Sequence, residues 1–514
     1  MEAFLQPLQG LAEFEEIKKR CGANRGILNV SGCMESQKVH LMYGLSGLFP
    51  CHLILADDER NAKEIYEDYR FYDKNVYFYP AKDLLFFQAD IHGNLLIRQR
   101  MRVIRALLEQ EEVTVVTSID GCMDFLMPLE KIKSSLLHFK SDSVIDLDQL
   151  KADLVDLGYE RVGQVELPGQ FSVRGGIIDI YPLTEENPWR IELWDDEIDS
   201  IRSFDAESQR SLENIDEITI YPATEKMDSE DMVSFLDYFP EEKTLLFLDE
   251  LNHLAENGEG VEEEYHQSRM HREEKGEANL PEQWLCGFQE VQKKLNRRNC
   301  VAVSALSPRR SGWKINEEFD LTVKSVDSYN SSFELLVKDL LQYKSQGYRI
   351  ALLSGSRTRA ERLAKDLSEE GLNAFYSQDI DRIISPGEIM VVYGHARRGF
   401  QYPLIKFAVM TETDIFGKEQ KKRKKKKKYS GNRIQDFAEL SIGDLVVHEK
   451  HGLGIYRGIE KVEVDRVVKD YIKIEYRGGS NLYILATQLD ALQKYSGSSE
   501  NAKTPKLNKL GGQE

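Results

Sequence analysis

The chain has 514 residues and a formal net charge of −19 at pH 7. This length is too great for one hydrophobic core, so roughly three to five domains are expected. A hydrophobic share of 41% beside 30% charged residues excludes wholesale disorder. The acidic balance excludes a protein that coats nucleic acid with its whole surface, so any contact with a polyanion must be local.

The chain carries no sign of a secreted or membrane protein. Its six cysteines are scattered and form no Cys-x-x-Cys pair, which favours reduced thiols over a disulfide framework or a zinc site. No apolar run approaches the ~20 residues of a membrane span. Residues 1–20 have the apolar spacing of an amphipathic helix and not of a signal peptide. These patterns predict a soluble, cytoplasmic protein with no membrane partner.

Residues 27–118 alternate short apolar strands with amphipathic helical patterns. Buried strands are expected at 51–56, 75–79 and 113–118. Strands that alternate with helices indicate a parallel sheet covered by helices. Two later apolar segments, 244–249 and 300–306, are expected to rejoin this sheet. The acidic segment 256–277 between them reads as a surface insertion or a loose helix.

The loop after the first strand departs from a nucleotide-binding loop. A phosphate loop of the form Gly-x-x-x-x-Gly-Lys-Ser/Thr needs glycines for close backbone approach, a lysine for charge and a hydroxyl for Mg²⁺. Here the text is Val30-Ser-Gly-Cys-Met-Glu-Ser-Gln-Lys38, which keeps Gly32 but lacks the second glycine and the Lys-Ser/Thr pair. Glu35 would repel phosphate. We therefore expect no useful ATP binding.

The strand at 245–250, Leu-Leu-Phe-Leu-Asp-Glu, superficially matches a Mg²⁺-binding acidic strand of nucleotide hydrolases. Without a phosphate loop this match is weak, because apolar strands commonly end in acids. Asp249 and Glu250 are expected to be a solvated strand end.

The segment 171–204 has the strongest binding signature. Period-2 alternation predicts strands at 171–174, 189–194 and 197–204, with an interruption at Gly175-Gly176. If Ile191 and Leu193 face the core, then the opposite, solvent-facing side carries Arg190, Glu192 and Trp194. A tryptophan beside an arginine on an outward face is the composition of a binding hot spot.

The runs Arg-Gly-Gly-Ile-Ile-Asp-Ile-Tyr-Pro from Arg174 and Ile-Glu-Leu-Trp-Asp-Asp-Glu-Ile-Asp-Ser-Ile-Arg from Ile191 resemble the domain that UvrB shares with the bacterial transcription-repair coupling factor, Mfd. In that family this domain docks the damage-recognition protein UvrA. The resemblance implies UvrA binding by Arg174, Arg190 and Trp194; the family often has Phe where Trp194 stands. UvrB keeps a working ATP site at the position of the Gly32 loop and the coupling factor has lost it, so the degenerate loop favours the coupling factor.

A second α/β pattern and a basic run follow. Strands are predicted at 349–354, 374–377, 388–393 and 407–411, with a helix at 358–370. This unit resembles the third domain of the family. Residues 421–428 are eight consecutive Lys or Arg residues, which indicates an exposed linker. Lys424, Lys425 and Lys426 are candidates for a non-specific, salt-sensitive nucleic-acid contact.

Residues 442–492 change to short strand patterns separated by glycine turns, which predict a small antiparallel barrel or sheet. The text from Gly443 to Gly458 resembles the RNA-polymerase-interaction module that the coupling factor shares with CarD-type regulators. In the family this module binds the polymerase β subunit by adding a strand at an edge. The candidates are Ile459, Val462 and Val464, which could equally be barrel core. Two histidines, 448 and 451, are too few ligands for a metal site.

Together these patterns and the resemblance imply an α/β multidomain protein: a discontinuous UvrB-like α/β domain with an inserted α+β docking domain, a second small α/β domain, and a C-terminal small antiparallel β domain of Tudor or CarD type. The expected boundaries are 1–118 for the first part of the UvrB-like domain, 119–212 for the UvrA-docking domain, 213–335 for the second part, 345–417 for the third domain, 418–440 for the basic linker, 441–495 for the polymerase-interaction domain and 496–514 for a tail.

The resemblance implies an adaptor in transcription-coupled nucleotide-excision repair that binds stalled RNA polymerase at one end and UvrA at the other. It implies no catalytic residue, metal or cofactor in these residues, because the family's ATP- and Mg-dependent motor, with most of its DNA contacts, would lie beyond Glu514. Two alternatives stay open: a UvrB-like ATP-dependent damage-verification enzyme and a stand-alone CarD-type polymerase regulator. The degenerate loop disfavours the first, and the second leaves the UvrB-like part without a role.

Overall fold

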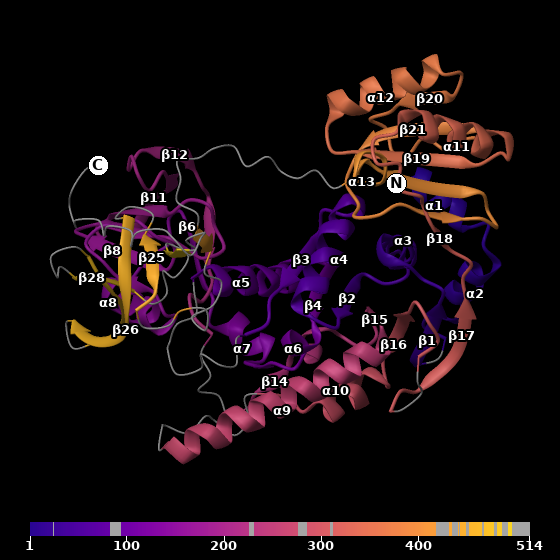
Figure 1. Ribbon diagram of the computed structural model, residues 1–514. Coiled ribbons are helices and arrows are strands. Elements are labelled where there is room, and N and C mark those ends of the chain that lie inside the picture. The colour runs from indigo at the N-terminus through magenta and orange to yellow at the C-terminus, as the bar shows by residue number, and fades with distance from the viewer. Residues whose placement is uncertain are drawn as a thin grey trace, which may run out of the picture. The chain divides into compact units, whose positions relative to one another are not determined.

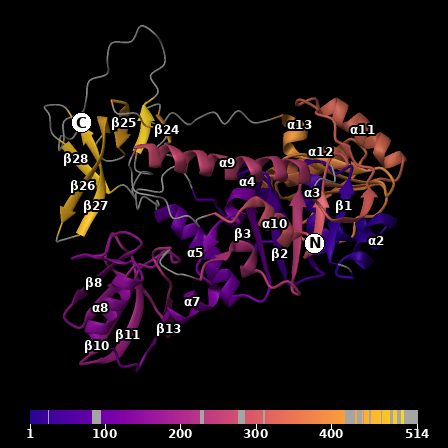
Figure 2. The same cartoon turned by 90° about the horizontal axis from the view of Figure 1, so that it is seen from below.

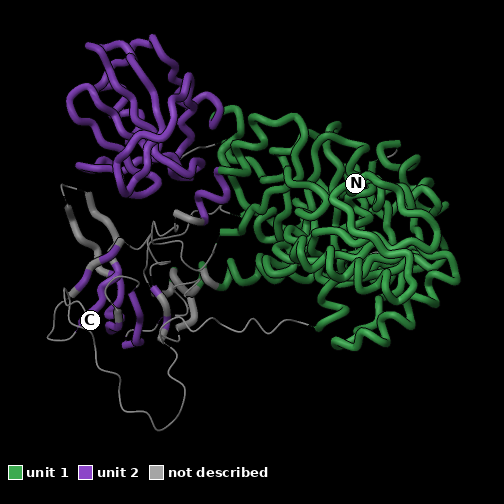
Figure 3. The backbone as a smooth tube through the Cα atoms, turned by 90° about the horizontal axis from the view of Figure 1, so that it is seen from above, with its two compact units in different colours: residues 1–82, 102–131, 227–422 green, residues 83–101, 132–226, 423–514 purple. Residues whose placement is uncertain are grey.

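The structure of the protein is a computed structural model, which describes residues 1–23, 25–82, 94–225, 231–275, 285–308, 312–417, 431–433, 440, 443–448, 452–464, 467–476, 481–485 and 492–495. The chain divides into two compact units (Figure 3). One comprises residues 1–82, 102–131 and 227–422, and the other comprises residues 83–101, 132–226 and 423–514.

The first unit contains a seven-stranded sheet in the order β17-β1-β16-β15-β2-β4-β3 (Figure 1). All of its pairings are parallel. Strands β15 and β16 rejoin the sheet after the inserted segment, as the sequence predicts, which gives the discontinuous domain that the family resemblance implies. The edge strand β17 is an addition that the sequence analysis does not predict. The strands are β1 Gly26–Ser31, β2 Cys51–Ala56, β3 Val76–Tyr79, β4 Val113–Ser118, β15 Thr244–Asp249, β16 Asn299–Val303 and β17 Ile315–Asp320.

Helices cover this sheet, as a parallel sheet with two apolar faces requires. The predicted N-terminal helix is two short helices, which bury Phe4, Leu8, Phe14 and Ile17. Up to Lys275, the acidic segment expected as an insertion or loose helix lies in the 25-residue helix α9. The elements of this unit are α1 Glu2–Leu8, α2 Ala12–Arg20, α3 Glu35–Ser46, α4 Glu59–Tyr72, α6 Ile119–Cys122, β5 Phe125–Leu126, β14 Val233–Ser234, the 3-10 helix η2 Phe235–Tyr238, α9 Leu251–Lys275 and α10 Phe288–Leu295. Helices α5 Asn94–Glu109 and α7 Leu129–Ser134 belong to this unit only in part, from Arg102 onward and up to Lys131 respectively.

A second α/β sheet in the same unit has the order β18-β22-β23-β19-β21-β20. Its four predicted strands and one predicted helix lie within one residue of their expected bounds. Helix α11 precedes them and buries Leu336 and Leu340 in this core, so the domain begins before the expected residue 345. The elements are β18 Lys324–Ser325, α11 Phe333–Ser345, β19 Arg349–Ser354, α12 Arg357–Glu369, β20 Asn373–Tyr376, β21 Glu388–Tyr393, β22 Phe400–Tyr402, β23 Phe407–Thr411 and α13 Glu412–Phe416.

The two α/β sheets of this unit share one hydrophobic core, to which α1, α3, α4, β22 and β23 contribute. A buried polar network crosses the same boundary. Tyr402 Oη accepts a hydrogen bond from Gln37 Nε2 at 3.0 Å and lies 3.1 Å from His40 Nδ1. Arg397 donates from Nε to Asp68 at 3.0 Å. Because both apolar and polar contacts bridge them, the two domains form a single packed body.

The second unit contains the inserted domain, whose six-stranded sheet has the order β12-β11-β10-β9-β8-β7. Helix α8 lies beside this sheet (Figure 2) and buries Leu150 and Leu154. A separate pair joins β13 to β6, which places residues 217–220 with this domain, beyond the boundary at 212 expected from the sequence. The elements are β6 Leu137–Lys140, α8 Leu147–Asp156, β7 Glu160–Arg161, β8 Gln170–Arg174, β9 Ile177–Ile180, β10 Trp189–Trp194, β11 Glu197–Phe204, β12 Ser211–Asn214 and β13 Glu217–Ile220.

The C-terminal strands form an antiparallel sheet in the order β24-β29-β25-β26-β27-β28. Its small core includes Val446, Tyr456, Ile472 and Ile474. The antiparallel β character that the sequence predicts here is confirmed. The strands are β24 Gly431–Arg433, β25 Leu445–His448, β26 Gly452–Val464, β27 Val467–Glu475, β28 Asn481–Leu485 and β29 Leu492–Tyr495. Across the described residues of the whole chain, no helix is long and apolar enough to cross a membrane.

Candidate docking surfaces and a closed phosphate loop

The sheet of the inserted domain has one apolar and one polar face. Phe171, Ile178 and Ile191 are fully buried on the apolar face. On the polar face the register aligns one row across four strands, Ser172, Asp179, Arg190 and Arg202. The next row on the same face is Arg174, Ile177, Glu192 and Ser200. Strand alternation therefore places Arg190 and Trp194 on the side opposite Ile191, as the sequence pattern predicts.

A buried carboxylate stands between two of the candidate arginines. Asp179 is 0% exposed. Its Oδ1 accepts a hydrogen bond from Arg190 Nε at 2.6 Å, and its Oδ2 accepts from Arg190 Nη2 at 2.9 Å and from Arg174 Nη2 at 2.6 Å. The contact with Arg190 is bidentate, the strongest form of arginine–carboxylate pairing. This hydrogen bonding to Asp179 raises the pKa of Arg190, so its guanidinium stays charged.

Arg190 is held on two further sides. Its Nη2 donates to Gln209 Oε1 at 3.1 Å, and its guanidinium carbon lies 4.3 Å from the centroid of the Phe204 ring. Stacking on an aromatic ring fixes the guanidinium plane. The Arg190 side chain is consequently only 15% exposed, whereas that of Arg174 is 46% exposed. The two predicted arginines thus lie together but are not equally accessible.

Trp194 ends β10 beside the tight turn at Asp195, whose φ is 60°. It is 80% exposed, which is unusual for the largest aromatic side chain. Between it and Arg190 on the same face, Glu192 forms an ion pair with Arg202. The polar face therefore presents an exposed arginine, an anchored arginine and an exposed tryptophan.

The backbone N–H groups of the loop after β1 already have hydrogen-bond acceptors within the protein. Gly32 N–H donates to Ala305 O at 3.3 Å and Cys33 N–H donates to Ser304 O at 3.1 Å. Met34 N–H donates to Gln37 Oε1 at 3.0 Å. A Cβ at Gly32, where φ is +76°, would lie 2.1 Å from Leu321 O. A phosphate cradle needs such N–H groups to point at the ligand, and here they are already bonded within the protein.

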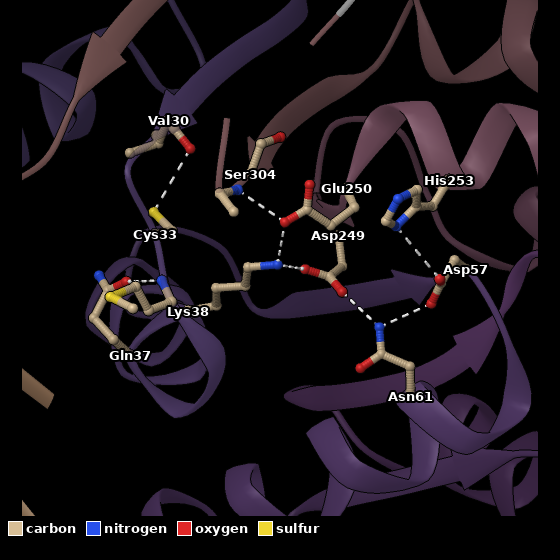
Figure 4. Close-up of polar contacts among 12 residues, drawn as sticks. Val30, Cys33, Gln37, Lys38, Asp57, Asn61, Asp249, Glu250, His253 and Ser304 are labelled. Carbon is tan, nitrogen blue, oxygen red and sulfur yellow. Dashed lines mark hydrogen bonds and ion pairs between the residues drawn. The ribbon is translucent and has the colours of Figure 1, made fainter. Parts of the chain in front are cut away.

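Lys38 turns into the protein and not toward a ligand (Figure 4). Its Nζ lies 2.7 Å from Asp249 Oδ1 and 2.6 Å from Glu250 Oε1. Asn61 Nδ2 donates to the other oxygen of Asp249 at 2.7 Å. Burial alone would lower the pKa of Lys38, but the two carboxylates raise it above its ordinary value.

The expectation of a solvated strand end is therefore wrong for Asp249, which is 2% exposed. The physical reason is that Lys38, displaced from the position of a phosphate-binding lysine, supplies the charge that lets the carboxylate be buried. Glu250 also accepts a hydrogen bond from Ala305 N–H at 2.8 Å. The acidic end of β15 and the lysine that follows the degenerate loop thus pair with each other.

In the C-terminal sheet, β26 changes partners along its length. Gly452 to Ile455 pair with β25, and from Ile455 the recorded pairings run to β27. Ile459 is 38% exposed and lies opposite Ile472. Val462 and Val464 lie opposite Lys469 and Val467 in the register, and their side chains fall outside the described residues. Within the described residues, this second half of β26 has a strand on one side only.

The remaining sequence candidates do not form a site in the described residues. Lys424, Lys425 and Lys426 lie outside them, as does His451, while His448 is buried. No group of three or more His, Cys, Asp or Glu side chains that could hold a metal occurs in the part of the chain that the structure describes.

Sequence reasoning missed the residues that support the arginines. Asp179, Phe204 and Gln209 were not singled out. For Asp179 a signal exists, because it is the one charged residue in the apolar run from Ile177 to Ile180, and buried acids are rare unless paired. Phe204 and Gln209 carry no such signal, since the contact of Phe204 depends on the pairing of two strands and that of Gln209 on the fold of a turn.

Two family models match the chain. The UvrB interaction domain matches residues 137–225, and the CarD-like/TRCF RID domain matches residues 440–496. The transcription-repair-coupling factor of Bacillus subtilis (strain 168) is 31% identical, over 94% of this chain and 47% of that protein. That of Staphylococcus aureus (strain MRSA252) is 29% identical, over 86% of this chain and 42% of that protein. The predicted resemblance to the coupling factor is confirmed, and the chain spans about half the length of the curated relatives that it matches.

Proposed function

We propose that this chain is an adaptor of transcription-coupled nucleotide-excision repair, which recruits UvrA through the inserted domain and binds RNA polymerase through the C-terminal sheet. The observation that carries the first half is the polar face with Arg174, Arg190 and Trp194, which lies inside the UvrB interaction match. Similarity to coupling factors along nearly the whole chain supports the repair role.

The chemistry of the polar face suits a protein partner with an acidic, partly apolar patch. Arg174 offers a half-exposed guanidinium, and Trp194 offers a large apolar surface that costs little conformational entropy to bury. Such a pair supplies both electrostatic complementarity and a hydrophobic anchor. UvrA is the partner that the family implies.

The C-terminal sheet suits strand addition. The second half of β26 carries backbone donors and acceptors along a side to which the described residues contribute no strand. An extended segment of the polymerase β subunit could pair there through main-chain hydrogen bonds, with alternate side chains providing specificity. Ile459, Val462 and Val464 are the proposed contact residues. Lys424, Lys425 and Lys426 are proposed to add only a non-specific attraction to nucleic acid.

We assign no nucleotide chemistry to the Gly32 loop. Its N–H groups and Lys38 are committed to internal partners, so the UvrB-like ATPase is the weaker reading. Calorimetric titration of Mg-ATP into the chain distinguishes the adaptor from the ATPase. The adaptor predicts no heat of binding at this loop, and saturable ATP binding that is lost in Lys38→Met would favour the enzyme.

The UvrA half is tested by measuring the affinity of immobilised chain for purified UvrA. Trp194→Ala and Arg174→Ala remove exposed groups, and each is expected to weaken binding at least about tenfold, as for hot-spot residues. Arg161→Ala is the matched control, since Arg161 is an exposed arginine of the same sheet. Equal affinity of all four proteins for UvrA would reject this surface as the docking site.

A further inference from the structure

The carboxylate of Asp179 is the centre of the polar face and is inaccessible to any partner. It is fully buried, yet three hydrogen bonds from two arginines converge on it. A buried acid at the centre of an exposed cationic surface reduces the positive charge offered to a partner. Asp179 therefore does not act by offering its own charge to a partner, and its position at the surface arginines needs another explanation.

We propose that Asp179 is a positioning residue of the docking face, which fixes the guanidinium groups of Arg174 and Arg190 for UvrA; this inference rests on the docking function proposed above. Its Oδ2 accepts from Nη2 of both arginines, at 2.6 Å from Arg174 and 2.9 Å from Arg190. Two like charges are thereby held next to one another by a shared counter-charge. Without it their repulsion would drive the exposed Arg174 away from the sheet.

The arrangement pre-organises the surface. A free arginine side chain samples many rotamers, and immobilising it on binding weakens the complex. Arg190 is already fixed by Asp179, Gln209 and Phe204. The Arg174 side chain is 46% exposed, and its guanidinium donates a hydrogen bond to Asp179. Asp179 should therefore influence UvrA binding mainly through Arg174.

Asp179→Asn separates positioning from charge, because the substitution keeps the shape of the side chain but makes the face one charge more positive. If UvrA responds only to net positive charge, the variant binds as well as the wild type or better. If the placement of the arginines matters, it binds about tenfold more weakly despite the added charge. Arg174→Lys provides the complementary test, since it keeps the charge at an exposed site and loses the planar guanidinium.

A double-mutant cycle distinguishes positioning from a general structural role. In the Arg174→Ala/Arg190→Ala background, the arginines that Asp179 would position are absent, so Asp179→Asn should change the residual UvrA affinity less than about twofold. Binding of the polymerase β subunit by the same variants reports whether the rest of the chain is intact. A tenfold loss that persists in this background would show that Asp179 only stabilises the sheet.

The outcomes are distinct. No UvrA binding by the wild-type chain would refute the docking function itself. UvrA binding that Asp179→Asn and Arg174→Lys both leave unchanged or strengthen would overturn the positioning role and leave the docking function standing. Should Asp179→Asn fail to fold, Arg174→Lys alone decides: a loss of about tenfold supports fixed guanidinium placement, and full affinity refutes it.

Discussion

Replacing Lys38 by methionine should destabilise the first α/β sheet, because it leaves the buried carboxylate of Asp249 without its cation. The Lys38 ammonium lies 2.7 Å from Asp249 and 2.6 Å from Glu250, and the Lys38 side chain is 12% exposed. Removing one partner of a buried ion pair costs about 3–5 kcal/mol. Asn61 retains its hydrogen bond to Asp249 and some solvent reaches the site, so we expect a loss of about 2–3 kcal/mol.

Hydrogen–deuterium exchange of peptides from β1 and β15 is the suitable assay, because it reports local stability in a chain with two units. A loss of about 2–3 kcal/mol corresponds to exchange that is roughly 30- to 150-fold faster. Lys63→Met is the matched control, since Lys63 pairs with Glu59 on the exposed surface of α4, where ion pairs contribute about 0–1 kcal/mol. Exchange in Lys38→Met that matches this control would refute the account of the closed loop.

Three other predictions follow from the same structure. Gly32→Ala should lower the local stability of the first unit by more than about 2 kcal/mol, as measured by hydrogen–deuterium exchange, because the added Cβ would clash with Leu321 O. Gly371→Ala is the control: it has a similar φ of +80° but open space around it, so it should lower local stability by only about 1–2 kcal/mol. Burial lowers the pKa of His40 to about 4, whereas the imidazole of the unfolded chain takes up its proton near pH ~6.5. The free energy of unfolding should therefore fall progressively as the pH drops from ~6.5 toward 4, and urea unfolding of His40→Gln should show a flatter pH profile. Val462→Arg should weaken binding to the polymerase β subunit in a pull-down while UvrA binding is retained, and loss of both partners would contradict separate docking surfaces.

The architecture was predictable where hydrophobic period and glycine punctuation agree. The four predicted strands of the third domain follow from apolar runs such as Ile350 to Leu353. Strand β17 was not predicted because its sequence, Ile-Asn-Glu-Glu-Phe-Asp, alternates half-buried and exposed residues at an edge and carries only two apolar residues. Helix α11 was not predicted, although its buried residues Leu336, Val337 and Leu340 are spaced as on one face of a helix.

The candidate site was predictable at the level of a sheet face but not of its contacts. Alternation along β10 is enough to place Arg190 and Trp194 on one side. The convergence of both arginines on Asp179 depends on the register between β8, β9 and β10, which no single-strand pattern contains. The same limit explains Asp249: its burial depends on Lys38, which is more than 200 residues away in the chain.

Formation of a three-component complex tests the adaptor most directly. The chain, purified UvrA and the polymerase β subunit are mixed and separated by size-exclusion chromatography with light scattering. The account predicts one species that contains all three, reduced to chain and β subunit by Trp194→Ala and to chain and UvrA by Val462→Arg. Separate elution of wild-type chain, UvrA and β subunit at micromolar concentrations would contradict it.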